Sequence, residues 1–262
     1  MRIDKYHLLL LAFFCASILA AQETIQPKQM DDPTKGLVYN QEFAVNFRMH
    51  THGLGFGFNV GKLQTYYRTK YWHFEMGELR HAKEYRQRFD NASTINAGVS
   101  RAYKYGKQNN LLVLRTGIGA KRYFSEKAKH KGVAVGISYE AGATLGLLKP
   151  YYLELKTEGG SSSYSIRYTE ETAERFLNKN LIQGASSWSK GFGHLSFLPG
   201  AHARFSVHFD WGAFDEYLKS FEGGIMVDAF ARQATIMVEG DGVQNNLLFL
   251  NLFLNLQFGK RW

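Results

Sequence analysis

The chain has 262 residues, of which 45% are apolar and 15% aromatic, with a formal net charge of +9 and a single cysteine. So many aromatic side chains exclude an intrinsically disordered chain, and one cysteine excludes a small scaffold held by disulfides. The positive charge by itself identifies no partner, because net charge governs association and solubility rather than fold.

The first 21 residues read as a secretory signal peptide. They run MRIDKYHLLLLAFFCASILAA, with Arg2 and Lys5 ahead of an apolar stretch over 8–20. That stretch is shorter than the roughly 20 residues that a membrane-spanning helix needs. We therefore expect cleavage after Ala21, and we favour it over an uncleaved anchor or a lipoprotein modified at Cys15.

Residues 22–36 contain two prolines and little hydrophobic content, which predicts a flexible periplasmic leader ahead of one domain over 37–262. In that domain apolar residues recur at every second position, the period of a half-buried β-strand. Ten segments alternate in this way: 41–50, 54–60, 64–78, 94–105, 111–124, 133–147, 151–157, 200–211, 221–231 and 248–258. The longest stretch between them, 158–199, reads as a loop that could contain a short helix over 169–179.

Alternating strands in an exported protein fit either a soluble β-fold or a membrane barrel. The face opposite the apolar one carries Gly, Ala, Ser and balanced charges, which suits a narrow enclosed lumen better than a solvated sheet. The apolar face is unbroken over as many as eight alternate positions, a span of about 16 residues. The usual strand of a globular sheet has only about 5–6 residues. These features predict an all-β fold, a transmembrane antiparallel up-and-down β-barrel of about ten strands, with eight or twelve as alternatives.

The connections give this barrel a direction. If the first of ten strands starts in the periplasm, most short turns lie on the periplasmic side and most long loops lie outside the cell, as in outer-membrane barrels. An even number of strands also returns both termini to the periplasm. In this arrangement the basic loop 125–131 lies outside the cell. Arg101 falls on the apolar face of the 94–105 strand, where its charge has no explanation.

The closing segment LLFLNLFLNLQFGKRW, which ends at Trp262, and the glycine-rich aromatic hairpin over 41–60 resemble small outer-membrane β-barrels of the Bacteroidota type. The similarity is one of pattern and covers about 37–262. That broad group includes PorT-like and PorG-like proteins, which belong to the type IX secretion and gliding apparatus. The resemblance implies an outer-membrane location and a role in an envelope complex.

Charged side chains on the polar face of the strands form the best-supported candidate site. Facing inward, six acids and five bases can neutralise one another, and an interior this narrow is filled by side chains. We therefore expect a packed network rather than an open pore. Its members are Glu42, Arg48, Glu75, Arg115, Lys121, Glu140, Glu154, Lys156, Arg204, Asp210 and Asp228.

One polar strand face carries His202, Ser206, His208 and Asp210, residue types that could build an activated nucleophile. Residues two apart on a strand lie about 6.6–6.8 Å apart along its axis, which is too far for an in-line triad without cross-strand partners. Ser206, His208 and Asp210 are therefore weak catalytic candidates, and a lumen lining is the favoured role.

The histidines show no ligand spacing that predicts a metal site, because zinc needs three or four converging ligands, and no cofactor motif is present. The histidines weighed for such a site are His50, His52, His73, His194, His202 and His208.

A basic cluster surrounds the 125–131 loop. At an outer-membrane address the phosphates of lipopolysaccharide are the available counter-charge. A solvated loop is favoured over specific binding of these phosphates, and nucleic acid is not expected as a partner. The cluster consists of Lys121, Arg122, Lys127, Lys129, His130 and Lys131.

The expected function is therefore non-enzymatic. We interpret the chain as a structural or accessory component of an envelope complex, with secretion as one setting, that contacts outer-membrane lipid and other envelope proteins. The alternatives are a small passive channel and an outer-membrane hydrolase directed at lipid or peptide.

Overall fold

The computed structural model describes residues 39–65, 67–87, 101–124, 133–157, 162–211, 216–240 and 242–262. All of them belong to one compact unit, Gly36–Trp262. The predicted signal peptide, the whole of the predicted leader 22–36, residues 94–100 and the loop 125–131 lie outside the described residues.

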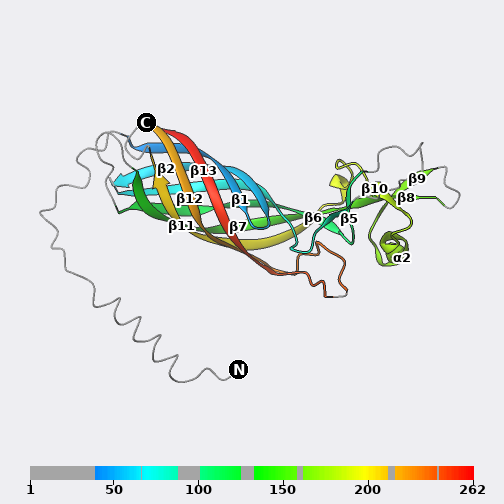
Figure 1. The fold of residues 1–262 in the computed structure, drawn as a ribbon. Coiled ribbons are helices and arrows are strands. Elements are labelled where there is room, and N and C mark those ends of the chain that lie inside the picture. The colour runs from blue at the N-terminus through cyan, green and yellow to red at the C-terminus, as the bar shows by residue number, and fades with distance from the viewer. Residues whose placement is uncertain are drawn as a thin grey trace, which may run out of the picture. The chain divides into compact units, whose positions relative to one another are not determined.

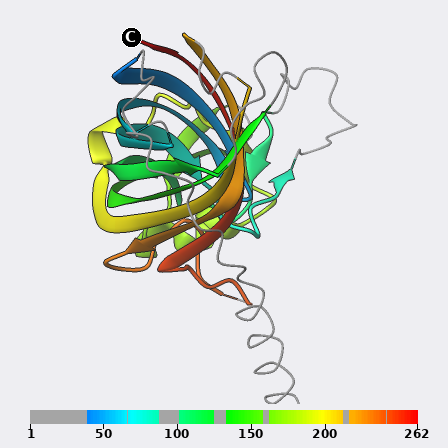
Figure 2. The same ribbon diagram turned by 90° about the vertical axis from the view of Figure 1, so that its left-hand side faces the viewer.

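Eight antiparallel strands close into a barrel, so the strand count is eight rather than ten (Figure 1). Figure 2 shows the same ring of strands after a turn of 90°. Around the ring the order is β1, β2, β3, β6, β7, β11, β12 and β13, and β13 pairs with β1. The strands are β1 Gln41–His50, β2 Gly53–Thr65, β3 Arg68–Leu79, β6 Asn109–Tyr123, β7 Ala134–Pro150, β11 Ser196–Asp210, β12 Tyr217–Phe230 and β13 Leu248–Arg261.

Two of the ten predicted strands lie outside the barrel. The described part of 94–105 contributes only β5 (Tyr103–Lys104), which pairs with β4 (Arg86–Gln87). The segment 151–157 becomes β8 (Tyr152–Lys156), which joins a separate three-stranded sheet. The all-β closed barrel is confirmed, and eight strands is one of the predicted alternatives. The favoured count of ten was too high because alternation reports a half-buried strand and does not say to which sheet the strand belongs.

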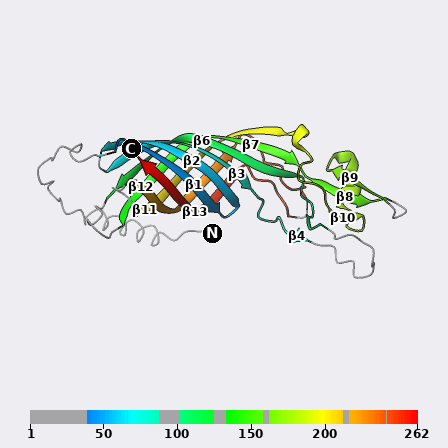
Figure 3. The same cartoon turned by 90° about the horizontal axis from the view of Figure 1, so that it is seen from above.

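We call the residues 151–195 together with 101–105 the head; Figure 3 shows it beyond the ends of β6 and β7. Its sheet has the order β10–β8–β9. Its other elements are β9 Ser163–Arg167, η1 Glu170–Thr172, α2 Ala173–Leu177, β10 Ile182–Ala185 and η2 Phe192–His194. The core of the head is apolar and consists of Tyr103, Leu153, Leu155, Phe176 and Ile182, all of them buried.

None of the described helices has the length and apolar character to cross a membrane.

With eight strands, the three longest connections (80–108, 151–195 and 231–247) lie at the end of the barrel that carries the head, and both ends of the barrel sequence lie at the other. We call these the head end and the terminal end. With two strands fewer in the barrel, β6 and β7 run in the direction opposite to the one predicted. The end of β6 and the start of β7 therefore lie at the terminal end, and the predicted external loop between them, 125–131, lies outside the described residues.

Arg101 is not on a barrel strand either. Its backbone carbonyl lies 3.4 Å from the amide of Ala185 in the head, so the charge predicted on the apolar wall is absent from that wall.

The barrel carries apolar side chains outside and polar ones inside. In β13 every second residue is exposed, with Leu252 at 68%, whereas Asn251 and Asn255 are fully buried. The two-residue period of the closing strand predicts this arrangement, because successive side chains of a strand point to opposite faces.

Candidate functional site

Arg115 of β6 lies at the centre of the barrel interior and holds two carboxylates. Its Nε and Nη2 donate to the two oxygens of Asp228 on β12, at 2.7 and 2.9 Å. Its Nη1 donates to Glu75 Oε1 on β3, at 2.6 Å. Arg115 and Asp228 are fully buried, so their charges are stable there only because the bidentate geometry replaces the lost hydration.

Two more arginines complete this central layer. Arg48 of β1 donates to Glu75, and Arg204 of β11 donates to Glu140 of β7. Arg204 Nη2 also lies 3.0 Å from Glu75 Oε1. With Arg115 the layer contains three cations and three carboxylates, so its formal charge is balanced.

A second ionic layer lies nearer the terminal end. Lys121 Nζ donates to Glu42 Oε1, and Arg261 Nε donates to Glu42 Oε2, both at 2.9 Å. Arg261 Nη2 reaches Asp210 Oδ2 at 2.9 Å. These side chains come from β1, β6, β11 and β13, and the layer therefore links strands that are far apart in the sequence.

The hydrogen bonds of His208 assign it to this layer as a cation. Its Nδ1 lies 2.8 Å from Glu222 Oε1, and a carboxylate only accepts, so Nδ1 carries a hydrogen. The Tyr123 hydroxyl donates to Asp210 Oδ2 at 2.9 Å, so it accepts from His208 Nε2 at 3.2 Å. Both ring nitrogens then donate, and the imidazolium balances Glu222.

His73, Glu140 and His202 form the one group with metal-ligand character among the described residues. Their ligand atoms are 3.0, 3.5 and 3.9 Å apart, close to the roughly 3.3 Å edge of a tetrahedral zinc site with bonds of about 2.0–2.1 Å. Electrostatics opposes a metal, because Glu140 Oε1 already accepts from Arg204 and the layer is neutral without an added cation. The sequence could not show this group, since its members come from three strands with no common spacing.

An apolar plug closes the lumen at the head end. Inward positions of the strands become apolar there, and part of the connection 231–247 packs against them. Asn245 holds that connection in place: its Oδ1 accepts from the amides of Ile236 and Met237 at 2.9 and 3.0 Å. The plug consists of Leu79, Leu111, Val113, Leu148, Leu198, Phe230, Ala234, Ile236, Met237 and Phe249.

Most of the charged residues proposed for the lumen lie in these two layers: Glu42, Arg48, Glu75, Arg115, Lys121, Glu140, Arg204, Asp210 and Asp228. Glu154 and Lys156 do not, because β8 belongs to the sheet of the head. The prediction missed Glu222 and Arg261, although Glu222 shares the inward period of Asp228 and Arg261 that of Gln257.

The weak catalytic candidates do not form a triad. The Ser206 hydroxyl lies 2.5 Å from that of Ser138, whereas His208 bonds Glu222 and Tyr123. His208 Nε2 and Asp210 Oδ2 are 4.0 Å apart. His202 is bonded to His73 and to Thr144. Ser206, His208 and Asp210 are buried, and their side chains bond to other residues of the barrel interior.

A separate ion cluster joins the head to the plug. Glu84 Oε1 accepts from Lys107 Nζ at 2.7 Å and also from Lys104. Burial lowers the pKa of Lys107 to about 8, and Glu84 opposes this shift. Burial raises the pKa of Glu84, but the two ammonium groups outweigh it and the net shift is downward. Lys107 also forms a β-bridge with Met237 of the plug.

Comparisons with known proteins identify no family for this chain. No protein-family model matches the chain, and no curated protein matches it. Among solved structures, the chain is similar to the N-terminal β-barrel domain of Pseudomonas aeruginosa OprF, with 10% identity, a TM-score of 0.35, and coverage of 86% of this chain and 98% of that one. At this TM-score the likeness carries no argument, and the fold rests on the eight paired strands.

Proposed function

We propose that the chain is an outer-membrane β-barrel without an open channel, which anchors the head in the envelope and presents it to other envelope proteins. The observation that carries this proposal is the reversed distribution of side chains in the barrel. A ring of exposed Leu, Phe and Trp is unstable in water, and a bilayer admits barrels only when they are closed, so that every backbone group is paired.

The connections support an orientation with the head outside the cell and the terminal end in the periplasm. The structure puts the longest connections at the head end, and bacterial outer-membrane barrels have long external loops and short periplasmic turns. The three longest connections therefore still share one end of the barrel, although β6 and β7 run opposite to the predicted direction.

The filled interior is the argument against the passive-channel alternative. Two ionic layers cross the lumen, Arg115 and Lys121 are buried at its axis, and the apolar plug covers the head end. An eight-stranded barrel has an interior only wide enough for its own side chains.

An exposed aromatic pair on the head is the best candidate for a contact with a partner. Trp188 is 67% exposed and Phe192 43%, and their ring centroids are 5.0 Å apart. Lys149 Nζ lies 4.1 Å from the Trp188 ring and 4.5 Å from the Phe192 ring, which fixes both rings before any partner binds. Such preordered tryptophans dominate the energy of many protein interfaces. An envelope-complex role, with secretion as one setting, also agrees with the resemblance of the sequence to Bacteroidota-type barrels.

The test has two parts, one for the barrel and one for the head. The purified protein should require detergent, migrate differently on mild-SDS gels after heating, and give no conductance steps in planar bilayers. In native membranes, the double change Trp188→Ala and Phe192→Ala should remove crosslinks to envelope proteins, whereas Tyr164→Ser, an exposed control on the same head, should retain them. Stable solubility without detergent, or regular conductance, would overturn the proposal.

A further inference from the structure

Four cations face one another on the outer wall of the barrel at the terminal end. In the strand register, Lys62 of β2 lies opposite Lys70 of β3, and Arg68 of β3 lies opposite Arg122 of β6. All four are exposed and occupy outward positions. Like charges directly opposite each other across two strands destabilise a sheet, so this arrangement needs an anion.

No carboxylate in the described part of the chain supplies that anion. Among the described residues none of the four cations forms an ion pair, whereas on β13 of the opposite wall the exposed Lys260 is 2.9 Å from Glu216. The two walls lie at the same end of the barrel and differ in this respect. Lys219 of β12, at the same end, also forms no ion pair among the described residues, but it lies opposite Phe258 and faces no other cation. What distinguishes the β2–β3–β6 wall is therefore that its unpaired cations face one another.

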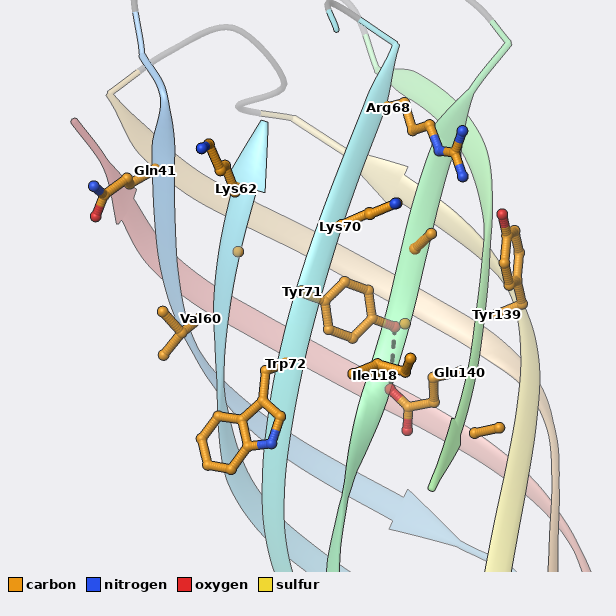
Figure 4. Close-up of a pocket in the computed structure, with 14 residues that line it drawn as sticks. Gln41, Val60, Lys62, Arg68, Lys70, Tyr71, Trp72, Ile118, Tyr139 and Glu140 are labelled. Atoms are coloured by element: carbon orange, nitrogen blue, oxygen red, sulfur yellow. Dashed lines mark hydrogen bonds between the residues drawn. The ribbon is translucent and has the colours of Figure 1, made fainter. Parts of the chain in front are cut away.

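An apolar groove of about 770 Å³ begins beside these cations (Figure 4). Lys70 lies opposite Ala120, and Ala120 lies opposite Tyr139, so one small residue separates the cation from the aromatic ring. The next row toward the head end is Val60, Trp72, Ile118 and Ala141, which are paired in that order across four strands. Ala120 and Ala141 leave the space, and Trp72, Ile118 and Tyr139 border it, with Ile118 73% exposed.

We propose that this groove binds one anionic glycerophospholipid, with its phosphate among Lys62, Arg68 and Lys70 and an acyl chain against Trp72 and Ile118. The assignment rests on the proposed membrane location. A phosphate alone would leave the apolar groove unused, and a lipid without net charge would leave the cations unneutralised. Lysine and arginine stems lie along apolar surface while their charged heads reach the headgroup level.

The position of the four cations predicts from which leaflet of the outer membrane the lipid is bound. They lie at the terminal end, which the proposed orientation puts at the periplasmic leaflet and away from the external loops. Arg122 therefore belongs to this lipid site, and Lys121 is buried in its pair with Glu42. Both residues belong to the basic cluster that was predicted around an external loop, and the structure puts neither of them at the head end.

The experiment measures lipid retention by native mass spectrometry. The protein is folded into phosphatidylcholine vesicles that contain one tenth phosphatidylglycerol, transferred to mild detergent, and its bound lipid is identified. We expect the wild type to retain phosphatidylglycerol in preference to phosphatidylcholine. The double variant Lys62→Gln and Lys70→Gln should reduce that preference about 30-fold, the effect of removing two basic residues at a membrane surface.

Two variants separate a built site from a general attraction to charge. Lys219→Gln removes an exposed, outward cation at the same end of the barrel on β12, and it should leave the preference unchanged. Ala141→Phe fills the groove and keeps all four cations, and it should abolish retention. Equal loss in Lys219→Gln, or full retention in Ala141→Phe, would overturn the lipid site.

The control for folding is heat-modifiable migration, which every variant should share with the wild type. Failure of the wild type to insert into vesicles would contradict the proposed membrane function. Normal insertion with equal retention of phosphatidylglycerol and phosphatidylcholine would overturn the lipid site and leave the membrane function intact.

Discussion

The barrel and the head bury opposite kinds of side chain. In the barrel Arg115 is fully buried and Leu252 is 68% exposed, whereas in the head Phe176 is fully buried and its neighbours Glu174 and Arg175 are exposed. Both regions are encoded by the same two-residue alternation, apart from the short helix. The comparison teaches that the period of a strand separates its two faces but does not say which face is inside. The surrounding solvent decides that.

The largest expected effect comes from breaking the polar interior. Arg115→Met leaves Asp228 buried without a cation, and removing one partner of a buried ion pair costs about 3–5 kcal/mol. We expect little or no folding into lipid vesicles, measured by heat-modifiable migration and by unfolding in urea. The double variant Arg115→Met and Asp228→Asn removes both charges and should recover much of the loss. No recovery would mean that Arg115 acts through its packing and not its charge.

The matching change in the head breaks an apolar core. Phe176→Ala should cost about 3–5 kcal/mol, because it removes a fully buried ring and leaves a cavity. The loss should be confined to the head, so proteolysis within 151–195 should accelerate while the barrel keeps its heat-modifiable migration. Parallel loss of both would show that the two regions unfold as one cooperative unit.

A lysine placed on the outer wall of the barrel and another on the surface of the head compare exposure to lipid with exposure to water. Leu252→Lys puts a charge on the outer wall of the barrel, where the cost at the bilayer midplane is about 2–4 kcal/mol. Ser163→Lys puts the same charge at an exposed position on the face of β9 that points away from the core of the head, where we expect a change within about 0.5 kcal/mol. Urea unfolding in vesicles measures both. Similar costs at the two sites would remove the contrast between the solvents.

The smallest effect is expected at the junction of the two regions. The pKa of Glu84 is lowered from its ordinary 4.5, so its stabilising contribution is complete above about pH 4.5 and is lost as the pH falls through the lowered value. Amide exchange of Tyr103 and Lys104, corrected for intrinsic rate, should therefore accelerate in acid.

Glu84→Gln is the matched variant for this junction. It leaves two ammonium groups without their carboxylate, at a cost of about 1–3 kcal/mol, and should remove the acid dependence. Burial lowers the pKa of Lys107, and the loss of Glu84 removes a charge that opposes this shift. Alkaline pH should therefore neutralise Lys107 and partly restore protection in that variant. An unchanged acid dependence in Glu84→Gln would assign it to another group.

The sequence predicts the strands of the barrel well because each strand carries its own period. The stripe from Leu248 to Phe258 identifies β13 without any knowledge of its neighbours, and β1 starts and ends at the expected residues. Membership of a sheet is a property of pairs of strands, so 151–157 has the right local pattern and the wrong assignment. That error carried Glu154 and Lys156 into the predicted lumen.

The contacts of the interior could not be predicted in the same way. Arg115 meets Asp228 because the sheet closes in a particular register over a separation of 113 residues, and His73 meets His202 over 129. Alternation shows that these side chains share the inner face. Alternation contains no information on how far each strand is shifted along its neighbours, and this register decides which inward side chains meet.

The long strand β7 has a mechanical consequence. It contains 17 residues that run from the terminal end to Pro150 at the base of the head, and it is paired on one edge with β6 and on the other with β11 up to Leu148. A pull on the head that acts along this strand is perpendicular to its hydrogen bonds, which run across the strand. The bonds on both edges would then be loaded together in shear instead of being peeled one at a time. We expect the connection between head and barrel to resist a force that a partner applies to the head along β7.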